Sequence, residues 1–461
     1  MKIYYNALLL SLYFSNFYNG ISFIEKRFQR SFNQTCLKYD FVKKYWNSLL
    51  YPNGRYVVFV LNEPGLKNGG LGDRIGGILT AMMMSLRFNR TLLIQSSNGF
   101  DELFRPYSDP SNNLSSYITY KNCLHSNSWS KYNPLLSDHD ETERDLYFCI
   151  NRNDKDTLCG LDNGDVEQPI IKLRGNRAYI CKWATHSQLK AYQELKSLGI
   201  DEHSDLLEVS GCLLRLSMWP TPKLFSYSES LFLNLITDNV KHMNFPLTDF
   251  YPKFLVGIHY RCGDISFTNP SGADRACQHD ESGKDPHPEV IHMKFGTPIE
   301  AANCARQVFL ENNHLINAIS ENFNLKYELY RLKYRDINIQ RMFLNNYYGS
   351  SVYISSDSQG SSKQINDTLK MNNSIITPKG CHIQLNPSNE CLLETTSYWL
   401  LLSLSDFIVT QTENRLPISA YSRYAAMYGL KKDSLRDAKN CSFPLTRFDM
   451  SRLHQGNWFC K

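Results

Sequence analysis

The residues best suited to bind or activate a substrate gather in the stretch 253–264. An apolar run rich in branched residues ends there in a polar cluster, and the run predicts a buried strand of a parallel sheet. His259 and Arg261 are two residues apart, so their side chains leave the same face of that strand. Ligands of open α/β sheets bind at the carboxyl ends of the strands, and a permanent cation beside a histidine suits an anion such as a diphosphate. An ordinary strand end, with Arg261 paired to Asp264, is the alternative interpretation.

A glycine-rich loop in the first half of the chain also directly follows a predicted strand. It joins a predicted strand at 56–61 to an apolar helix at 75–88, and a second strand follows at 91–94. The glycines of such a loop let backbone N–H groups approach a ligand, and the helix start favours an anion. A tight turn that merely requires glycine is the alternative. The loop does not fit Gly-x-Gly-x-x-Gly, which argues against a nicotinamide-dependent reductase.

Strands and helices alternate through the second half, which predicts a doubly wound parallel sheet. Thr297-Pro298-Ile299-Glu300 is a typical helix start, because it combines a cap, an early proline and a capping box. The helix at 419–429 has a serine cap and a glycine stop. Asp357 suits a ribose or base edge, and the start of the 419–429 helix suits a phosphate. The other predicted elements are strands at 351–358, 372–377 and 406–410 and helices at 224–240 and 392–404.

Four motifs occur in a fixed order along the chain: Gly-Gly-Leu-Gly-Asp-Arg, Gly-Ile-His-Tyr-Arg-Cys-Gly-Asp, Ile-Ser-Ser-Asp-Ser, and Ser-Asp-Phe-Ile-Val followed by Ser-Ala-Tyr-Ser-Arg-Tyr-Ala-Ala. On these motifs, residues 55–95 and 250–430 resemble the GDP-fucose-dependent fucosyltransferase superfamily, which includes α1,2-, α1,6- and protein O-fucosyltransferases. The resemblance implies an α/β, GT-B-like fold of two Rossmann-like, doubly wound domains that face a cleft. It also implies an inverting glycosyltransferase that moves fucose from GDP-fucose to a glycan or glycoprotein acceptor, with no metal or other cofactor.

The same resemblance implies the roles of individual residues. Arg261 would hold the β-phosphate and stabilise the charge of the leaving diphosphate. Asp73 is the first candidate for the base that deprotonates the acceptor, Asp264 the second, and an acid of the 274–285 segment the third. Asp264 could instead orient Arg261. Cys262 stands where many relatives have a second arginine, and Ala420 replaces a common serine. The expected donor-binding residues are Gly70, Gly72, Asp73, His259, Arg261, Asp357, Ser419, Tyr421 and Ser422, and the expected catalytic residues are Arg261, Asp73 and Asp264.

Three other functions compete with this hypothesis. A transferase that uses another nucleotide sugar would share the same fold. A catalytically inactive member of the fold could keep the cleft to bind carbohydrate or protein. A nicotinamide-dependent reductase is the third. The net charge of +5 is spread along the chain without a long basic block, so a nucleic-acid partner is not expected.

The amino-terminal segment and the cysteines point to the secretory pathway. An apolar core at 7–14 behind Lys2 predicts a secretory signal over residues 1–22, with an uncleaved membrane anchor and a buried first helix as alternatives. The 13 cysteines contain no Cys-x-x-Cys pair, which favours disulfides over a zinc site and the lumen of the Golgi or endoplasmic reticulum, or secretion, as the location. Short separations favour the pairs Cys149–Cys159, Cys381–Cys391 and Cys441–Cys460. Triplets for N-glycosylation begin at Asn33, Asn89, Asn113, Asn366, Asn372 and Asn440.

The 461 residues suffice for two or three domains with a large core. We expect a stem or first helix at 23–50, an acceptor-side Rossmann-like domain at 51–245, a donor-binding Rossmann-like domain at 246–435 and a carboxyl-terminal tail at 436–461.

Overall fold

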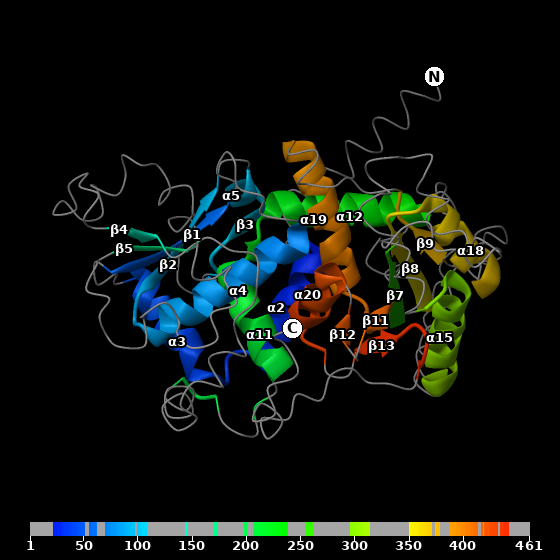
Figure 1. Cartoon of the computed structure of the whole chain (residues 1–461), viewed down its shortest axis with the longest axis horizontal. Coiled ribbons are helices and arrows are strands. Elements are labelled where there is room, and N and C mark those ends of the chain that lie inside the picture. Colours follow the sequence, from blue (N-terminus) through cyan, green and yellow to red (C-terminus); the bar gives the residue numbers. More distant parts are fainter. Residues whose placement is uncertain are drawn as a thin grey trace, which may run out of the picture.

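A computed structural model shows the arrangement of the chain (Figure 1). It describes residues 22–50, 55–61, 70–96, 99–107, 143–145, 170–173, 198–200, 204, 206–237, 254–261, 296–313, 350–370, 374–378, 388–413, 416–417, 419–431 and 434–441. Two parallel sheets lie on opposite sides of a layer of helices. Several predictions lie outside the described residues: the signal over 1–22 apart from its last residue, Asp264 and the acids of 274–285.

The first sheet belongs to the amino-terminal half and has the order β2-β1-β5-β4, with every neighbouring pair parallel. The predicted strands at 56–61 and 91–94 are confirmed as β1 (Tyr56–Leu61) and β2 (Thr91–Ser96). Strands β4 (Glu143–Asp145) and β5 (Ile170–Leu173) complete the sheet. Helix α4 joins β1 to β2 and spans Leu71–Arg87, so it begins four residues before the predicted start. The reason is local: the Asp73 carboxylate accepts from the Gly70 N–H at 3.2 Å and caps the helix there.

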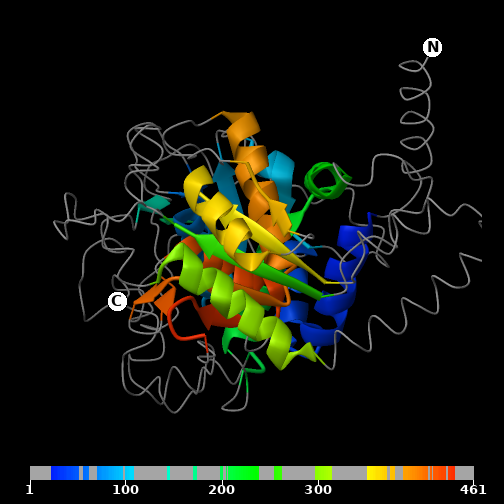
Figure 2. The same cartoon turned by 90° about the vertical axis from the view of Figure 1, so that its right-hand side faces the viewer.

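The second sheet has the order β13-β10-β7-β8-β9, again with parallel neighbours. Helices α15 and α18 cover one face of this sheet, and α19 and α20 cover the other, which confirms the predicted doubly wound arrangement (Figure 2). The elements are β7 (Phe254–Tyr260), α15 (Pro298–Glu311), β8 (Ser350–Ser356), α18 (Gln359–Leu369), β9 (Ser374–Ile376), α19 (Asn389–Ser403), β10 (Phe407–Thr410), α20 (Ala420–Gly429) and β13 (Leu435–Asp437).

The two predicted helix starts of this half are confirmed, but one predicted stop is wrong. The Thr297 hydroxyl accepts from the Glu300 N–H at 3.2 Å, and the Glu300 carboxylate accepts from the Thr297 N–H at 2.7 Å. At the start of α20, the Ser419 hydroxyl accepts from the Tyr421 N–H at 3.3 Å. Gly429, the expected stop, is instead the last helical residue, and Leu430 takes the left-handed conformation with φ 56°. Packing of the Leu430 side chain against the core compensates for the strain of that conformation.

Residues 23–50 form two helices that each bury an apolar face in the core, so the expectation of a stem is wrong and the alternative of a first helix is right. Helix α2 (Phe23–Thr35) buries Ile24, Phe28 and Phe32, which are spaced one turn apart. Helix α3 (Asp40–Leu50) follows it. Burial of such large apolar side chains contributes about 1.5–3 kcal/mol each, which holds the segment in the core.

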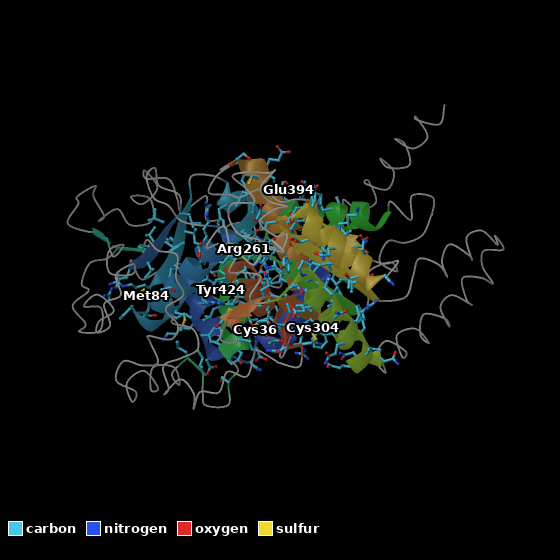
Figure 3. All side chains as sticks on the ribbon, turned by 45° about the vertical axis from the view of Figure 1, so that its right-hand side comes forward. Cys36, Met84, Arg261, Cys304, Glu394 and Tyr424 are labelled. Atoms are coloured by element: carbon cyan, nitrogen blue, oxygen red, sulfur yellow. A yellow bond between two sulfur atoms is a disulfide. The ribbon has the colours of Figure 1, made fainter. Side chains whose placement is uncertain are left out.

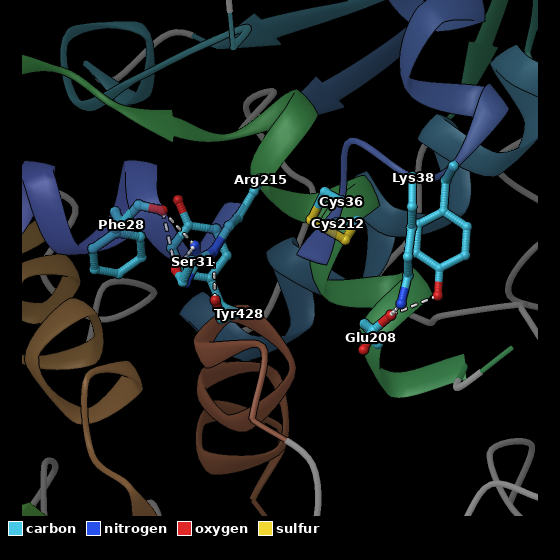
Figure 4. The surroundings of a disulfide bond; sticks show 9 residues. Phe28, Ser31, Cys36, Lys38, Glu208, Cys212, Arg215 and Tyr428 are labelled. Atoms are coloured by element: carbon cyan, nitrogen blue, oxygen red, sulfur yellow. Dashed lines mark hydrogen bonds and ion pairs between the residues drawn. A yellow bond between two sulfur atoms is a disulfide. The ribbon is translucent and has the colours of Figure 1, made fainter. Parts of the chain in front are cut away.

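Helix α2 is fastened to α11 (Leu206–Ser217) by covalent and polar contacts (Figure 4). Cys36 and Cys212 form a disulfide. The buried Arg215 guanidinium donates to the carbonyl oxygens of Phe28 at 2.9 Å and Tyr428 at 2.7 Å, and its carbon lies 4.3 Å from the centre of the Phe28 ring. One cation therefore joins α2, α11 and α20.

The other described disulfide corrects a predicted pairing. Cys441 is bonded to Cys304 of α15, not to Cys460. The chain after β13 runs beside α15 on the outer face of the second sheet, so the partner in space is far away in sequence. Cys391 is also disulfide-bonded. The pair Cys149–Cys159 lies outside the described residues.

The two halves share one hydrophobic core. A single cluster of buried side chains includes Phe59 of β1, Phe28 of α2, Leu401 of α19 and Met427 of α20. None of the described helices is long and apolar enough to cross a membrane. The remaining elements are α5 (Phe100–Leu103), β3 (Phe104–Arg105), β6 (Trp219–Pro220), α12 (Pro222–Thr237), β11 (Thr412–Glu413) and β12 (Leu416–Pro417).

Candidate functional site

The second sheet reverses its winding between β7 and β10. Helix α15, which follows β7, covers one face of the sheet, and α20, which follows β10, covers the other. The two strands are hydrogen-bonded neighbours, from Phe407 beside Val256 to Thr410 beside His259. Helices that leave adjacent strands toward opposite faces open a crevice at the carboxyl ends of those strands, and that crevice is where open α/β sheets bind ligands. His259 and Arg261 stand at this point.

Gln411 bridges the two strand ends across the reversal. Its side-chain oxygen accepts from the Arg261 N–H at 3.0 Å, and its side-chain nitrogen donates to the Gly296 carbonyl at 3.4 Å. The Tyr260 hydroxyl donates to the same carbonyl at 3.1 Å. The backbone that presents Arg261 is thus tied to β10 and to the segment before α15. Gln411 was absent from the sequence-based prediction, although its place directly after a predicted strand is the signal used for Arg261.

His259 faces α20, on the side of the strand opposite Tyr260. Its ring stacks on the Tyr421 ring, with centroids 5.1 Å apart and planes inclined by 26°. Burial, together with the nearby Arg261 charge, lowers the pKa of His259 from 6.5 to about 3. Its Nδ1 is buried and has no hydrogen-bond partner in the described part of the chain. A neutral imidazole beside a cationic arginine can exchange a hydrogen bond with a ligand but cannot add a second positive charge.

The start of α20 is fixed against β10 by hydroxyl groups. The Ser422 Oγ lies 3.0 Å from the Thr410 Oγ1 and donates to the Ser419 carbonyl at 3.1 Å. The Tyr421 hydroxyl donates to the Thr395 carbonyl of α19 at 3.0 Å. The side chains of Ser422 and Tyr421, both predicted to bind the donor, therefore have internal partners. Their described contacts position the helix start, whose backbone N–H groups and dipole attract an anion.

Asp357 directly follows β8, the strand that pairs with β7 on the side opposite β10. Its side chain is largely buried, and its charge helps burial to raise the pKa of Tyr260 above the usual value. Ser358, the next residue, caps α18 by accepting from the Ser361 N–H at 3.2 Å. The predicted acid thus stands at the same carboxyl edge as His259 and Arg261.

The glycine-rich segment meets the second half at the start of α20. A Cβ on Gly72 would lie 2.6 Å from the Tyr421 backbone nitrogen, so only glycine permits this approach. Because α4 follows β1 and α20 follows β10, this contact brings together the carboxyl edges of both sheets. The sequence suggested that the glycines of this loop permit a close ligand or a tight turn. At Gly72, glycine lets the starts of α4 and α20 touch.

Asp73 lies beside this contact. Its carboxylate accepts from the Gly70 N–H at 3.2 Å. Its charge also raises the pKa of the buried Tyr424 of α20, which burial brings to about 12. Asp73 therefore sits between the starts of α4 and α20. The labels of Arg261 and Tyr424 both lie near the middle of the molecule in Figure 3.

The structure thus brings together the predicted residues Gly70, Gly72, Asp73, His259, Arg261, Ser419, Tyr421 and Ser422 around the starts of α4 and α20. Asp264 lies outside the described residues. Among the residues that are described, no group of three or more His, Cys, Asp or Glu side chains could hold a metal ion.

No model of a known family matches this sequence, and no curated protein matches it. Among solved structures, the chain is similar to an arginine-to-lysine variant of Arabidopsis thaliana FUT1 in complex with GDP, at a TM-score of 0.40 and 14% identity over 89% of this chain and 78% of that one. The α-1,6-fucosyltransferase NodZ soaked with GDP-fucose gives a TM-score of 0.37 and 15% identity over 82% and 93%. NodZ from Bradyrhizobium gives 0.35 and 14% over 80% and 91%.

Proposed function

We propose that the protein is a glycosyltransferase that uses a nucleotide sugar. The observation that carries this proposal is the meeting of two helix starts, α4 and α20, at the carboxyl edges of two parallel sheets, with Arg261 at the winding reversal of the second sheet. Backbone N–H groups and a guanidinium at one point suit a diphosphate. A second sheet across the same point can present an acceptor, as in a GT-B-like fold of two Rossmann-like halves.

Within this class, we propose an inverting fucosyltransferase with GDP-fucose as the donor. The support is the set of motifs found in the sequence, which fall on the elements that form the candidate site: the start of α4, the end of β7, the end of β8 and the start of α20. The acceptor in this proposal is a glycan or a glycoprotein. No metal or other cofactor is part of the proposal.

The reaction follows from the charges. The acceptor hydroxyl oxygen attacks the anomeric carbon of fucose from the face opposite the diphosphate, the bond from that carbon to the β-phosphate oxygen breaks, and GDP leaves with the bonding electrons. Negative charge then grows on the diphosphate, where Arg261 and the start of α20 stabilise it. The acceptor proton passes to a carboxylate. Asp73 is our first candidate because it sits between the two helix starts, and Asp264 is the second.

Neighbouring residues complete the donor site in this proposal. His259, neutral and stacked on Tyr421, lies beside the phosphates and keeps Arg261 as the cation of that strand end. Asp357 accepts from the guanine or ribose at the adjacent strand end. The disulfides Cys36–Cys212 and Cys304–Cys441 support an oxidising compartment, so we place the protein in the lumen of the secretory pathway or outside the cell.

Calorimetric titration with GDP in the presence of EDTA tests the donor site. We expect the wild type to bind GDP and Arg261→Ala to bind it at least tenfold more weakly, because an arginine on phosphate contributes roughly 2–4 kcal/mol. Arg306→Ala, which removes an exposed arginine from α15, is the matched control and should bind as the wild type does. Transfer of fucose from GDP-fucose to a panel of glycans and folded glycoprotein domains then tests the reaction.

Three results would contradict the proposal. Equal GDP affinity in wild type and Arg261→Ala would show that Arg261 does not bind the diphosphate. Absence of GDP binding by the wild type would show that GDP is not the nucleotide of the donor. GDP binding without transfer to any acceptor would favour a catalytically inactive binding protein of this fold.

A further inference from the structure

Arg74 is a buried cation for which the described contacts do not account. It lies in the first turn of α4, and only 3% of its surface is exposed. Its Nε and Nη1 are buried and have no hydrogen-bond partner in the described part of the chain. Burial lowers the pKa of Arg74 to about 10, so the side chain stays protonated at neutral pH.

The neighbouring carboxylate does not satisfy this guanidinium. Asp73 accepts from the Gly70 N–H and caps the helix, and successive residues of a helix do not face each other. A buried donor without an acceptor is costly, and a buried charge more so. Such a group is explained if a ligand supplies the acceptor.

The position of Arg74 indicates where that ligand lies. Arg74 stands two residues after Gly72, whose backbone meets the start of α20, and one residue after Asp73, which caps α4. Helical side chains tilt toward the amino end of their helix. Because α4 follows β1, the Arg74 side chain leans toward the carboxyl edge of the first sheet, near the contact between the starts of α4 and α20.

We propose that Arg74 binds an oxyanion at the start of α4, opposite the site of Arg261. The planar guanidinium fork matches a phosphate or a carboxylate, and the positive end of the α4 dipole adds to the attraction. This inference rests on the proposed function, which offers two sources of the oxyanion: the diphosphate of the donor and the carboxylate of an acidic sugar in the acceptor.

Titrations of Arg74→Gln and Arg74→Lys with inorganic pyrophosphate, GDP, guanosine and glucuronic acid test the inference. If the donor supplies the oxyanion, pyrophosphate and GDP should bind at least tenfold more weakly to Arg74→Gln, while guanosine affinity stays unchanged. If the acceptor supplies it, only glucuronic acid should lose affinity, with glucose as its neutral control. Arg74→Lys keeps the charge without the fork and should lose part of the same affinity.

Arg90→Gln is the matched control, since Arg90 is also buried but follows the far end of α4. It should unfold at lower urea concentration than the wild type yet bind all probes unchanged. Wild-type affinity of Arg74→Gln for pyrophosphate, GDP and glucuronic acid would overturn the inference. If Arg74→Gln does not fold, unchanged affinities of Arg74→Lys would overturn it.

The result is separable from the proposed function. Pyrophosphate binding that depends on Arg74, in a protein that transfers no fucose, would leave the oxyanion site standing and contradict the fucosyltransferase. Fucose transfer that is equally efficient without Arg74 would support the fucosyltransferase and contradict the oxyanion site.

Discussion

At the scale of single residues, the site combines a fixed cation with an imidazole that stays neutral. Arg261 supplies the cation of this pair. His259 is neutral near pH 7, because burial and the Arg261 charge lower its pKa. The stack with Tyr421 places that neutral ring between β7 and α20. The pair therefore presents one positive charge at the strand end rather than two.

The His259 pKa predicts how stability depends on pH. The folded protein resists protonation of His259 down to about pH 3, whereas the unfolded chain protonates near the ordinary value of 6.5. The contribution of His259 to the unfolding free energy is therefore fully present above pH 6.5 and is lost as the pH falls. Between pH 7 and pH 5, we expect the wild type to lose about 2 kcal/mol of unfolding free energy relative to His259→Gln.

Urea unfolding of both proteins at several pH values measures this difference. The comparison cancels the titration of all other groups, because the two chains differ at one position. Parallel pH profiles would show that His259 is protonated as easily in the folded protein as in the unfolded chain.

At the scale of elements, α20 is packed unusually closely against two helices from the other half of the chain. Gly72 of α4 meets its start, and Gly211 of α11 meets its end, where an added Cβ would lie 2.1 Å from the Met427 carbonyl oxygen. Both glycines permit backbone-to-backbone contact that any side chain would prevent. The position of α20, and with it the phosphate end of the candidate site, depends on these contacts.

Gly211→Ala tests this dependence away from the candidate site. We expect it to destabilise the protein by about 1–3 kcal/mol, because the new methyl group forces α11 and α20 apart. Gly360→Ala is the matched control, since Gly360 is exposed in the first turn of α18. It should be neutral or slightly stabilising, as alanine favours helix. Equal urea midpoints for the two variants would contradict the close contact.

At the scale of the whole molecule, the two halves are joined through the helices between the sheets. Helix α2 contacts both halves: it is disulfide-bonded to α11, and Arg27 donates to the Leu404 carbonyl at 3.1 Å beside the second sheet. Arg215 adds hydrogen bonds from α11 to α2 and α20. The first helix of the described chain is therefore part of the structural centre.

Removal of the Cys36–Cys212 disulfide tests that role. The bond joins residues separated by 176 positions, and its loss should lower the unfolding free energy by roughly 2–5 kcal/mol. We expect the double variant Cys36→Ser/Cys212→Ser to unfold at lower urea concentration and to be cut faster by trypsin within α2, at Arg27 or Arg30. The variant Cys304→Ser/Cys441→Ser should lose stability without exposing α2. Unchanged trypsin resistance of the first variant would contradict the central role of α2.

Features that depend on neighbours along the chain could be predicted from the sequence. The strands β1, β7, β8 and β10 were predicted from apolar runs, and the starts of α15 and α20 from their caps, because the groups that make these hydrogen bonds are a few residues apart. The motif residues at strand ends could also be named, since parallel strands end at one edge of a sheet.

Features that depend on segments far apart in the chain became visible in the folded structure alone. Four features depend on where other elements lie: the burial of α2, the pairing of Cys441 with Cys304, the bridge made by Gln411 and the Arg74 guanidinium, whose Nε and Nη1 are unpaired among the described residues. No local pattern encodes them, because the free energy comes from contacts between residues far apart in the chain. The same reason explains Gly72, whose need for glycine comes from α20 and not from its own loop.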